Sequence, residues 1–325
     1  MARTISLIGK TLVATSLAFF AGSALSQAYP SQPIRLVVPF SPGGGTDTFA
    51  RVVSAGMQPS LGQNIIVENK PGAGGNIGAD LVAKSKPDGY TLLLAQDSLA
   101  IVPWLYKDLT FDPIKDFEPI GVGVFMPMAL VVKSQLPVDS VKQLIDYSKA
   151  NPNKLSYGTP GVGTAHHLNF ESLLQTTGTK MVHVPYKGAS NMLSDLASGS
   201  VDVAFSALSS VKTLVDSGKL KIIGVADTKR SPQFTNVPTI AETVPNYTAS
   251  VWFGLMAPKG TPAPVTQKLS QAMSKALSSP EINKRLSDLG YRVQPTDSEG
   301  MKKIMNDEYS KWGALVKEVG IKPNE

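Results

Sequence analysis

The alternation of short β-branched runs with helical segments restricts the fold of this chain more than any other feature of its sequence. Strand character is clear in Ile34–Val38 (IRLVV), Ile65–Val67 and Tyr90–Ala95 (YTLLLA), and helical segments are expected at about 47–60 and 77–84. Such alternation is typical of βαβ units around a parallel sheet. The sequence therefore predicts an α/β fold.

The same alternation continues through the second half, and the C-terminal part is helical. Val265–Leu277 has apolar residues at helical spacing, Ser279-Pro280-Glu281 predicts a new helix that stops at Gly290, and Thr296 with Glu299 resembles a capping box before an amphipathic helix over 301–319. Further strands are expected at 129–132, 155–157, 181–184, 201–205 and 222–226, with helices at 141–150, 164–175, 189–196 and 208–216.

Two apolar segments mark places where the chain passes between domains. The length of 325 residues suggests about two domains. Gly121–Val132 (GVGVFMPMALVV) and Ser250–Ala257 (SVWFGLMA) are interpreted as the outward and return crossings. We therefore expect a discontinuous first lobe of residues 29–125 and 253–325, and an inserted second lobe of residues 126–252. A chain that crosses twice predicts a hinged pair of lobes with a cleft between them.

The N-terminal residues have the three parts of a secretory signal peptide. Arg3 and Lys10 precede the apolar run Thr11–Leu25, and Ser26-Gln27-Ala28 is a small-x-Ala cleavage pattern. A membrane anchor is the alternative, but the apolar run is short for a span. We expect residues 1–28 to be removed after Ala28 and the rest of the chain to reach the periplasm.

Composition excludes several kinds of function. The chain has no cysteine, which rules out disulfides, thiolate metal sites and cysteine nucleophiles. Its formal charge of +6, to which Arg3 and Lys10 contribute two, includes no basic run of the kind that nucleic acid requires. His166 and His167 are adjacent on a predicted helix and do not face the same way, so no metal site is expected. No motif of a hydrolase nucleophile or zinc protease is present, and no enzyme activity is predicted.

Glycine-rich loops follow several strands. Ligands of open α/β sheets bind beyond the C-terminal ends of the strands. Those ends carry the loops 40–47, 68–76, 96–98, 158–164, 185–189 and 206–209. The phosphate patterns GxxxxGK[ST] and GxGxxG are absent, and Asp47 would repel a phosphate, so no nucleotide cofactor is expected.

A carboxylate suits these loops better than a phosphate, because two or three backbone N–H groups at a helix N-terminus satisfy it. Gly45-Thr46 and Gly163-Thr164 each open a predicted helix, one in each lobe. Alternatives remain open: the glycine loops as plain turns, Asp47 as a first-turn carboxylate or the partner of a ligand amine, and Lys187 as an anion partner or a solvated side chain. Phe40 and Tyr186 are either walls of the cleft or core.

The chain resembles a known receptor family along its whole mature length. The strings YPSQPIRLVVPFSPGGGTDTFAR, ENKPGAGGN, PDGYTLLLA, YGTPGVGTAHHL and VPYKGAS occur in order and resemble the Bug family, the periplasmic receptors of tripartite tricarboxylate transporters. The resemblance implies a two-lobed, type II-like periplasmic-binding-protein fold. It also implies that Gly43–Asp47 and Gly161–Thr164 hold a carboxylate through backbone groups and water. The loop 206–209 lacks an acidic residue, which favours plain carboxylates over amino acids.

We therefore predict a monomeric periplasmic solute-binding protein for a small organic carboxylate. Its partner is an inner-membrane permease, or a sensor protein in the alternative; an exported enzyme on the same scaffold is the third hypothesis. The predicted ligand-binding residues are Phe40, Gly43, Gly44, Gly45, Thr46, Asp47, Asn76, Gln96, Asp97, Gly161, Val162, Gly163, Thr164, His167, Tyr186, Lys187, Gly188 and Ser206.

Overall fold

The computed structural model describes residues 29–186 and 188–321. Residues up to Ser31 and residues from Gln32 onward belong to two separate units, and the description below concerns the second. The predicted signal peptide (1–28) and the predicted site residue Lys187 lie outside the described residues.

The β-branched runs of the first half form the parallel group that the sequence predicts. Strand β1 (Ile34–Val38) pairs in parallel with β2 (Ile65–Asn69) on one side and with β3 (Thr91–Gln96) on the other. Helices α2 (Gly45–Leu61) and α3 (Asn76–Ala83) connect them. The C-terminal ends of these strands therefore lie at one edge of the sheet.

A second parallel group forms from the middle of the chain. Strand β5 (Ser156–Thr159) pairs in parallel with β6 (Val182–Pro185) and β7 (Val203–Ala207). The other elements of this group are β8 (Leu220–Val225), α5 (Val141–Ala150), α6 (Ala165–Thr177), α7 (Ala189–Ser198) and α8 (Leu208–Asp216).

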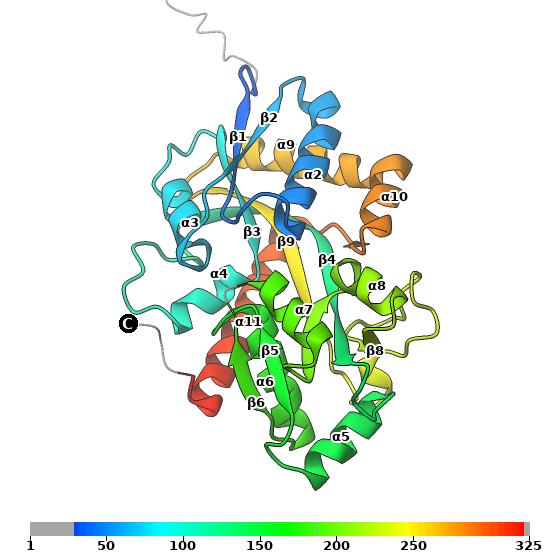
Figure 1. Ribbon diagram of the computed structural model, residues 1–325. Coiled ribbons are helices and arrows are strands. Elements are labelled where there is room, and N and C mark those ends of the chain that lie inside the picture. The colour runs from blue at the N-terminus through cyan, green and yellow to red at the C-terminus, as the bar shows by residue number, and fades with distance from the viewer. Residues whose placement is uncertain (1–28, 187, 322–325) are drawn as a thin grey trace, which may run out of the picture. The chain divides into compact units, whose positions relative to one another are not determined.

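Two long strands join the groups. Strand β4 (Phe117–Lys133) pairs antiparallel with β9 (Ser250–Pro258) along residues 117–127, and then antiparallel with β7 and β8 along residues 128–133. Figure 1 shows β4 running without a break from the group that holds β9 to the group that holds β8. The predicted crossover segments are thus two paired strands. The strand order across the described residues is β2-β1-β3-β9-β4-β7-β5-β6, with β8 and β10 also pairing with β4.

The C-terminal helices follow the predicted boundaries, but one predicted cap is wrong. The elements are α9 (Ala263–Ser278), α10 (Pro280–Asp288), β10 (Arg292–Val293) and α11 (Ser298–Val319). The N-cap of α11 is Asp297, whose carboxylate accepts a hydrogen bond from the Gly300 N–H at 2.8 Å. Thr296 does not cap the helix, because its hydroxyl accepts a hydrogen bond from the Val122 N–H on β4 at 3.1 Å.

The core lies on both faces of the sheet, and short helical turns complete the fold. Phe49 of α2, Trp252 and Phe253 of β9 and Trp312 of α11 are almost fully buried. No helix within the described ranges combines the length and the apolar character that a membrane span requires. Four short turns that the sequence did not predict are η1 (Ala73–Gly75), α4 (Ser98–Ile101), η2 (Val102–Trp104) and η3 (Ile240–Glu242).

Candidate ligand-binding site

A cavity of about 350 Å³ lies between the loops that the strand-end rule selects. The loops after β1 and β3 line one side, and the loop between β5 and α6 lines the other. Because these loops come from the two different strand groups, the cavity is an interlobe cleft.

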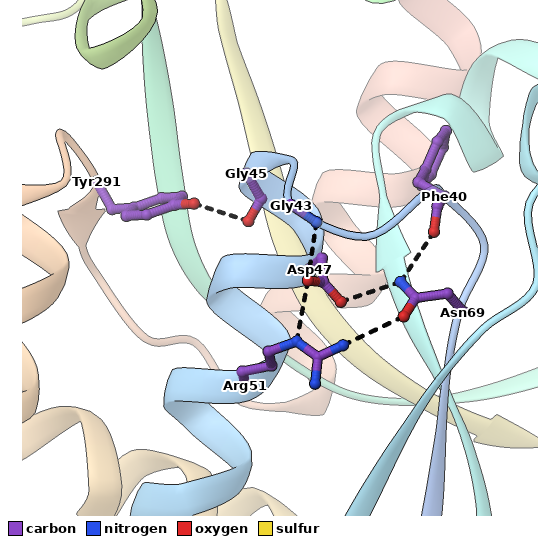
Figure 2. Close-up of polar contacts among 7 residues, drawn as sticks. All are labelled: Phe40, Gly43, Gly45, Asp47, Arg51, Asn69 and Tyr291. Carbon is purple, nitrogen blue, oxygen red and sulfur yellow. Dashed lines mark hydrogen bonds and ion pairs between the residues drawn. The ribbon is translucent and has the colours of Figure 1, made fainter.

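The carboxylate of Asp47 holds the first glycine loop (residues 40–47) in place. The Asp47 carboxylate accepts hydrogen bonds from the Gly43 N–H, the Arg51 Nε and the Asn69 Nδ2, each at 3.0 Å (Figure 2). Burial acts to raise the pKa of Asp47, but the hydrogen bonds from Arg51, Gly43 and Asn69 outweigh it and hold the pKa below its usual value. Asp47 is buried and does not line the cavity. It supports the loop that faces the ligand space.

Two further hydrogen bonds hold the same loop. Asn69 Nδ2 donates to the Phe40 carbonyl at 3.0 Å, and the Tyr291 hydroxyl donates to the Gly45 carbonyl at 2.7 Å (Figure 2). Gly43 has φ +86°, a conformation that favours glycine, whereas Gly44 is extended at φ −80° and is the N-cap of α2. The loop is therefore fixed through the carbonyls of Phe40 and Gly45 as well as through the Gly43 N–H.

The cavity side of this loop presents hydrogen-bond donors. The N–H groups of Gly45 and Thr46 lie in the first turn of α2, where no intrahelical acceptor exists. The Thr46 hydroxyl donates to Gln96 Oε1 at 2.9 Å, which leaves the Gln96 amide nitrogen available as a further donor.

The second glycine loop caps α6 in a similar way. The Thr164 hydroxyl donates to the Gly161 carbonyl at 2.9 Å and accepts from the His167 N–H at 3.3 Å. His167 Nδ1 in turn accepts from the Gly163 N–H at 3.0 Å. His167 is buried beneath the loop and positions it, so its ring does not line the cavity.

Below this loop lies a stack of aromatic rings. The rings of His167 and His183 stack with centroids 3.9 Å apart, and Tyr157 stacks on Phe170 at 4.0 Å. Burial lowers the pKa of His183 to about 4, so this imidazole is neutral at pH 7. Among residues 29–186 and 188–321, no group of three or more histidine or acidic side chains could hold a metal ion.

The second glycine loop lies close against the turns that follow β3. A Cβ added to Gly163 would lie 2.1 Å from Leu105 Cδ1, and Leu105 follows β3 on the other side of the cleft. The N-termini of α2 and α6 both border the same cavity, and each has backbone N–H groups that no helical carbonyl satisfies.

The structure brings together half of the predicted ligand-binding residues. Those that line the cavity are Phe40, Gly44, Gly45, Thr46, Gln96, Asp97, Val162, Gly163 and Thr164. Those that lie outside the lining are Gly43, Asp47, Asn76, Gly161, His167, Tyr186, Gly188 and Ser206.

Tyr186 and Ser206 are occupied elsewhere. The Tyr186 hydroxyl donates to Asp195 Oδ2 at 2.9 Å, and Ser206 is buried within β7. The lining residues that were not among the predicted set are Gly74, Ser98, Ile101, Val102, Leu105, Tyr106, Met126, Pro160, Ala165, His166, Ala189, Val251 and Phe253. Many are apolar, and in a sequence they look like core.

Two lobes joined by paired strands, with glycine loops opening two helices onto one cleft, define the class of two-lobed periplasmic binding proteins. A family model for the tripartite tricarboxylate transporter family receptor matches residues 49–321. The chain belongs to this family.

One named relative and two solved structures support the assignment to this family. Protein BugT of Bordetella pertussis is 35% identical over 325 residues, which cover 99% of each chain. The solved structure of R. palustris Rpa4515 with adipate has a TM-score of 0.81 and 35% identity, covering 91% of this chain and 100% of that one. MatC from Rhodopseudomonas palustris with bound malate has a TM-score of 0.74 and 32% identity, covering 89% and 100%.

Proposed function

We propose that this chain is a periplasmic substrate-binding protein that captures a small carboxylate-bearing solute in the interlobe cleft for a tripartite tricarboxylate-type transporter. The observation that carries the proposal is the pair of helix N-termini, at Gly45 and Ala165, that open onto the same cavity from the two strand groups. The adipate and malate bound in two solved relatives support a carboxylate as the ligand.

The donors of the cleft are sufficient for useful affinity. Hydrogen bonds to a charged group contribute about 1.5–3 kcal/mol each. The N–H groups of α2 and α6 and the Gln96 amide supply several such donors. Four of them at the upper value contribute about 12 kcal/mol. Less about 4 kcal/mol for association, the remainder equals the roughly −8 kcal/mol of micromolar binding.

Ligand capture involves closure of the lobes. We propose the division into residues 29–125 with 253–325 and residues 126–252, with the hinge where β4 changes partners between Pro127 and Met128 and where β9 starts at Ser250. The ligand binds the closed form more tightly and shifts the open–closed equilibrium toward it. The closed surface is then what the permease recognises.

A thermal-shift screen tests the binding function. The mature chain, residues 29–325, is heated with a broad panel of mono-, di- and tricarboxylates, because a ligand of the folded state raises the melting temperature. At one hundred times the Kd the stabilisation is about 2.7 kcal/mol. We expect at least one acid to act, and Gly44→Val to abolish its effect. A panel without any response contradicts the proposal.

Two further measurements test the processing and the absence of catalysis. Mass spectrometry of the exported protein is expected to place its N-terminus at Tyr29, and any later start contradicts cleavage after Ala28. The bound acid is expected to be recovered unchanged after prolonged incubation, and a new product would favour the enzyme hypothesis.

A further inference from the structure

The walls of the cleft are mostly apolar. Between the glycine loops, the cavity is bordered by the turns that follow β3 and by the crossover strands β4 and β9. These elements and the first glycine loop contribute aliphatic and aromatic side chains. They are Phe40, Ile101, Val102, Leu105, Tyr106, Met126, Val251 and Phe253.

Formal charge is nearly absent from the described lining. No lysine or arginine is among the described residues that border the cavity. His166 borders it, but burial lowers the pKa of this imidazole to about 4 and it is neutral at pH 7. Within the described lining, positive potential therefore comes from the N-termini of α2 and α6, each equivalent to about half a charge.

The single acidic residue of the described lining cannot serve a ligand amine. Both carboxylate oxygens of Asp97 are fully buried and have no hydrogen-bond partner among the described residues. Oxygens without solvent exposure do not face an open cavity, so Asp97 borders it with other atoms. Burial also raises the pKa of Asp97 well above its usual value, with a further contribution from the nearby Glu308 carboxylate.

From these walls we infer that the solute is an apolar-bodied acid: a hydrocarbon chain or ring that carries one or two carboxylates and no hydroxyl, ammonium or third carboxylate. This inference rests on the proposed carboxylate-binding function. It selects, within that function, against the hydroxylated and tricarboxylic acids.

The selection follows from what each substituent would meet. Each of the two helix N-termini carries about half a positive charge and can face one carboxylate, whereas a third carboxylate would have neither a helix N-terminus nor a cationic side chain of the described lining beside it. A hydroxyl or ammonium placed against Val251, Phe253 or Leu105 would lose its water and find no partner on these side chains, which weakens binding by about tenfold or more. Each methylene buried against the same wall strengthens binding by about fourfold.

Matched pairs of acids separate these contributions. Titration calorimetry of the mature protein compares succinate with malate, which adds one hydroxyl, and with aspartate, which adds one ammonium. It compares glutarate with propane-1,2,3-tricarboxylate, which adds one carboxylate. We expect each addition to weaken binding at least tenfold. The unsubstituted series from succinate to pimelate is expected to gain about fourfold per methylene until the cavity is full.

A variant of the wall gives a second test. Val251→Thr keeps the size of the side chain and adds a hydroxyl to the cavity, so it is expected to weaken the best unsubstituted acid about tenfold and to narrow the difference between succinate and malate. Val182→Thr is the matched control, because Val182 is 48% exposed and does not border the cavity. Should Val251→Thr fail to fold, the ligand series on the unaltered protein carries the test.

The outcomes distinguish the inference from the function on which it rests. If no acid of any kind binds, the proposed function is wrong. If acids bind but malate, aspartate or a tricarboxylate binds more tightly than its unsubstituted counterpart, the function stands and the apolar-body inference is overturned.

Discussion

Adjacent glycines of the first loop are expected to respond to the same substitution in opposite ways. Gly44 borders the cavity, has φ −80°, and a Cβ built on it meets only the Ser41 carbonyl oxygen, at 4.0 Å. Gly44→Val therefore causes no clash, and it lowers stability only by the poorer N-cap residue, about 0.5–1 kcal/mol. Its methyl groups enter the ligand space and displace one or two charge-assisted hydrogen bonds of about 1.5–3 kcal/mol each. That loss is roughly tenfold to a hundredfold or more in Kd.

Gly43→Val is the matched control. Gly43 does not border the cavity, and a Cβ built on it meets nothing within 4 Å, but its φ of +86° is unfavourable for a β-branched side chain. We expect a stability loss of about 1–3 kcal/mol, which lowers the melting temperature by about 2–4 °C per kcal/mol. The ligand Kd should change little.

Titration calorimetry and thermal melting on both variants decide the question. The expected pattern is lost binding with a slightly lower melting temperature for Gly44→Val, and retained binding with a clearly lower melting temperature for Gly43→Val. If Gly44→Val binds the ligand normally, the first loop does not form the carboxylate site, and the reasoning from its geometry fails.

Three further outcomes are expected. Gly163→Ala should weaken ligand binding at least tenfold in calorimetry, because its Cβ would lie 2.1 Å from Leu105 Cδ1, and Leu105→Ala in the same chain should restore part of the affinity. Tyr291→Phe should lower stability by about 1 kcal/mol in urea unfolding, because the Gly45 carbonyl loses its donor. Burial raises the pKa of Glu308 from 4.5 to about 7, so the folded state retains a proton that the unfolded state releases. Stability should therefore fall as the pH rises from about 4.5 to 7, and Glu308→Gln should remove this part of the slope.

Local sequence patterns were sufficient to predict most of the helices and strands. The helices Val141–Ala150 and Leu208–Asp216 have the bounds that the sequence predicts. These boundaries depend on residues within the segment and on the turns beside it, so a single sequence contains the necessary information. Strand β4 was predicted only as the short run 129–132, because its full length arises from pairing with β9 at one end and with β7 and β8 at the other.

The candidate site likewise has a part that the sequence could predict and a part that it could not. The glycine loops could be located because strand order alone places strand ends at one edge of the sheet. The apolar walls could not, because Ile101 and Leu105 look like core residues until the cavity beside them is known. The role of Asp47 also depended on distant residues, since Asn69, which holds its second oxygen, lies 22 positions away.

The direct pairing of β4 with β9 has a mechanical consequence. Two separate linkers would let the halves slide and rotate in many directions. Here the linkers are cross-linked by a ladder that runs from Phe117 opposite Pro258 to Pro127 opposite Ser250. The register shifts near Gly121 and Val124 are irregularities of the kind that bend a strand and increase its local twist. In the closure proposed above, this ladder keeps the two crossing strands in fixed register up to the hinge at Pro127 and Met128, so the two strands bend there together.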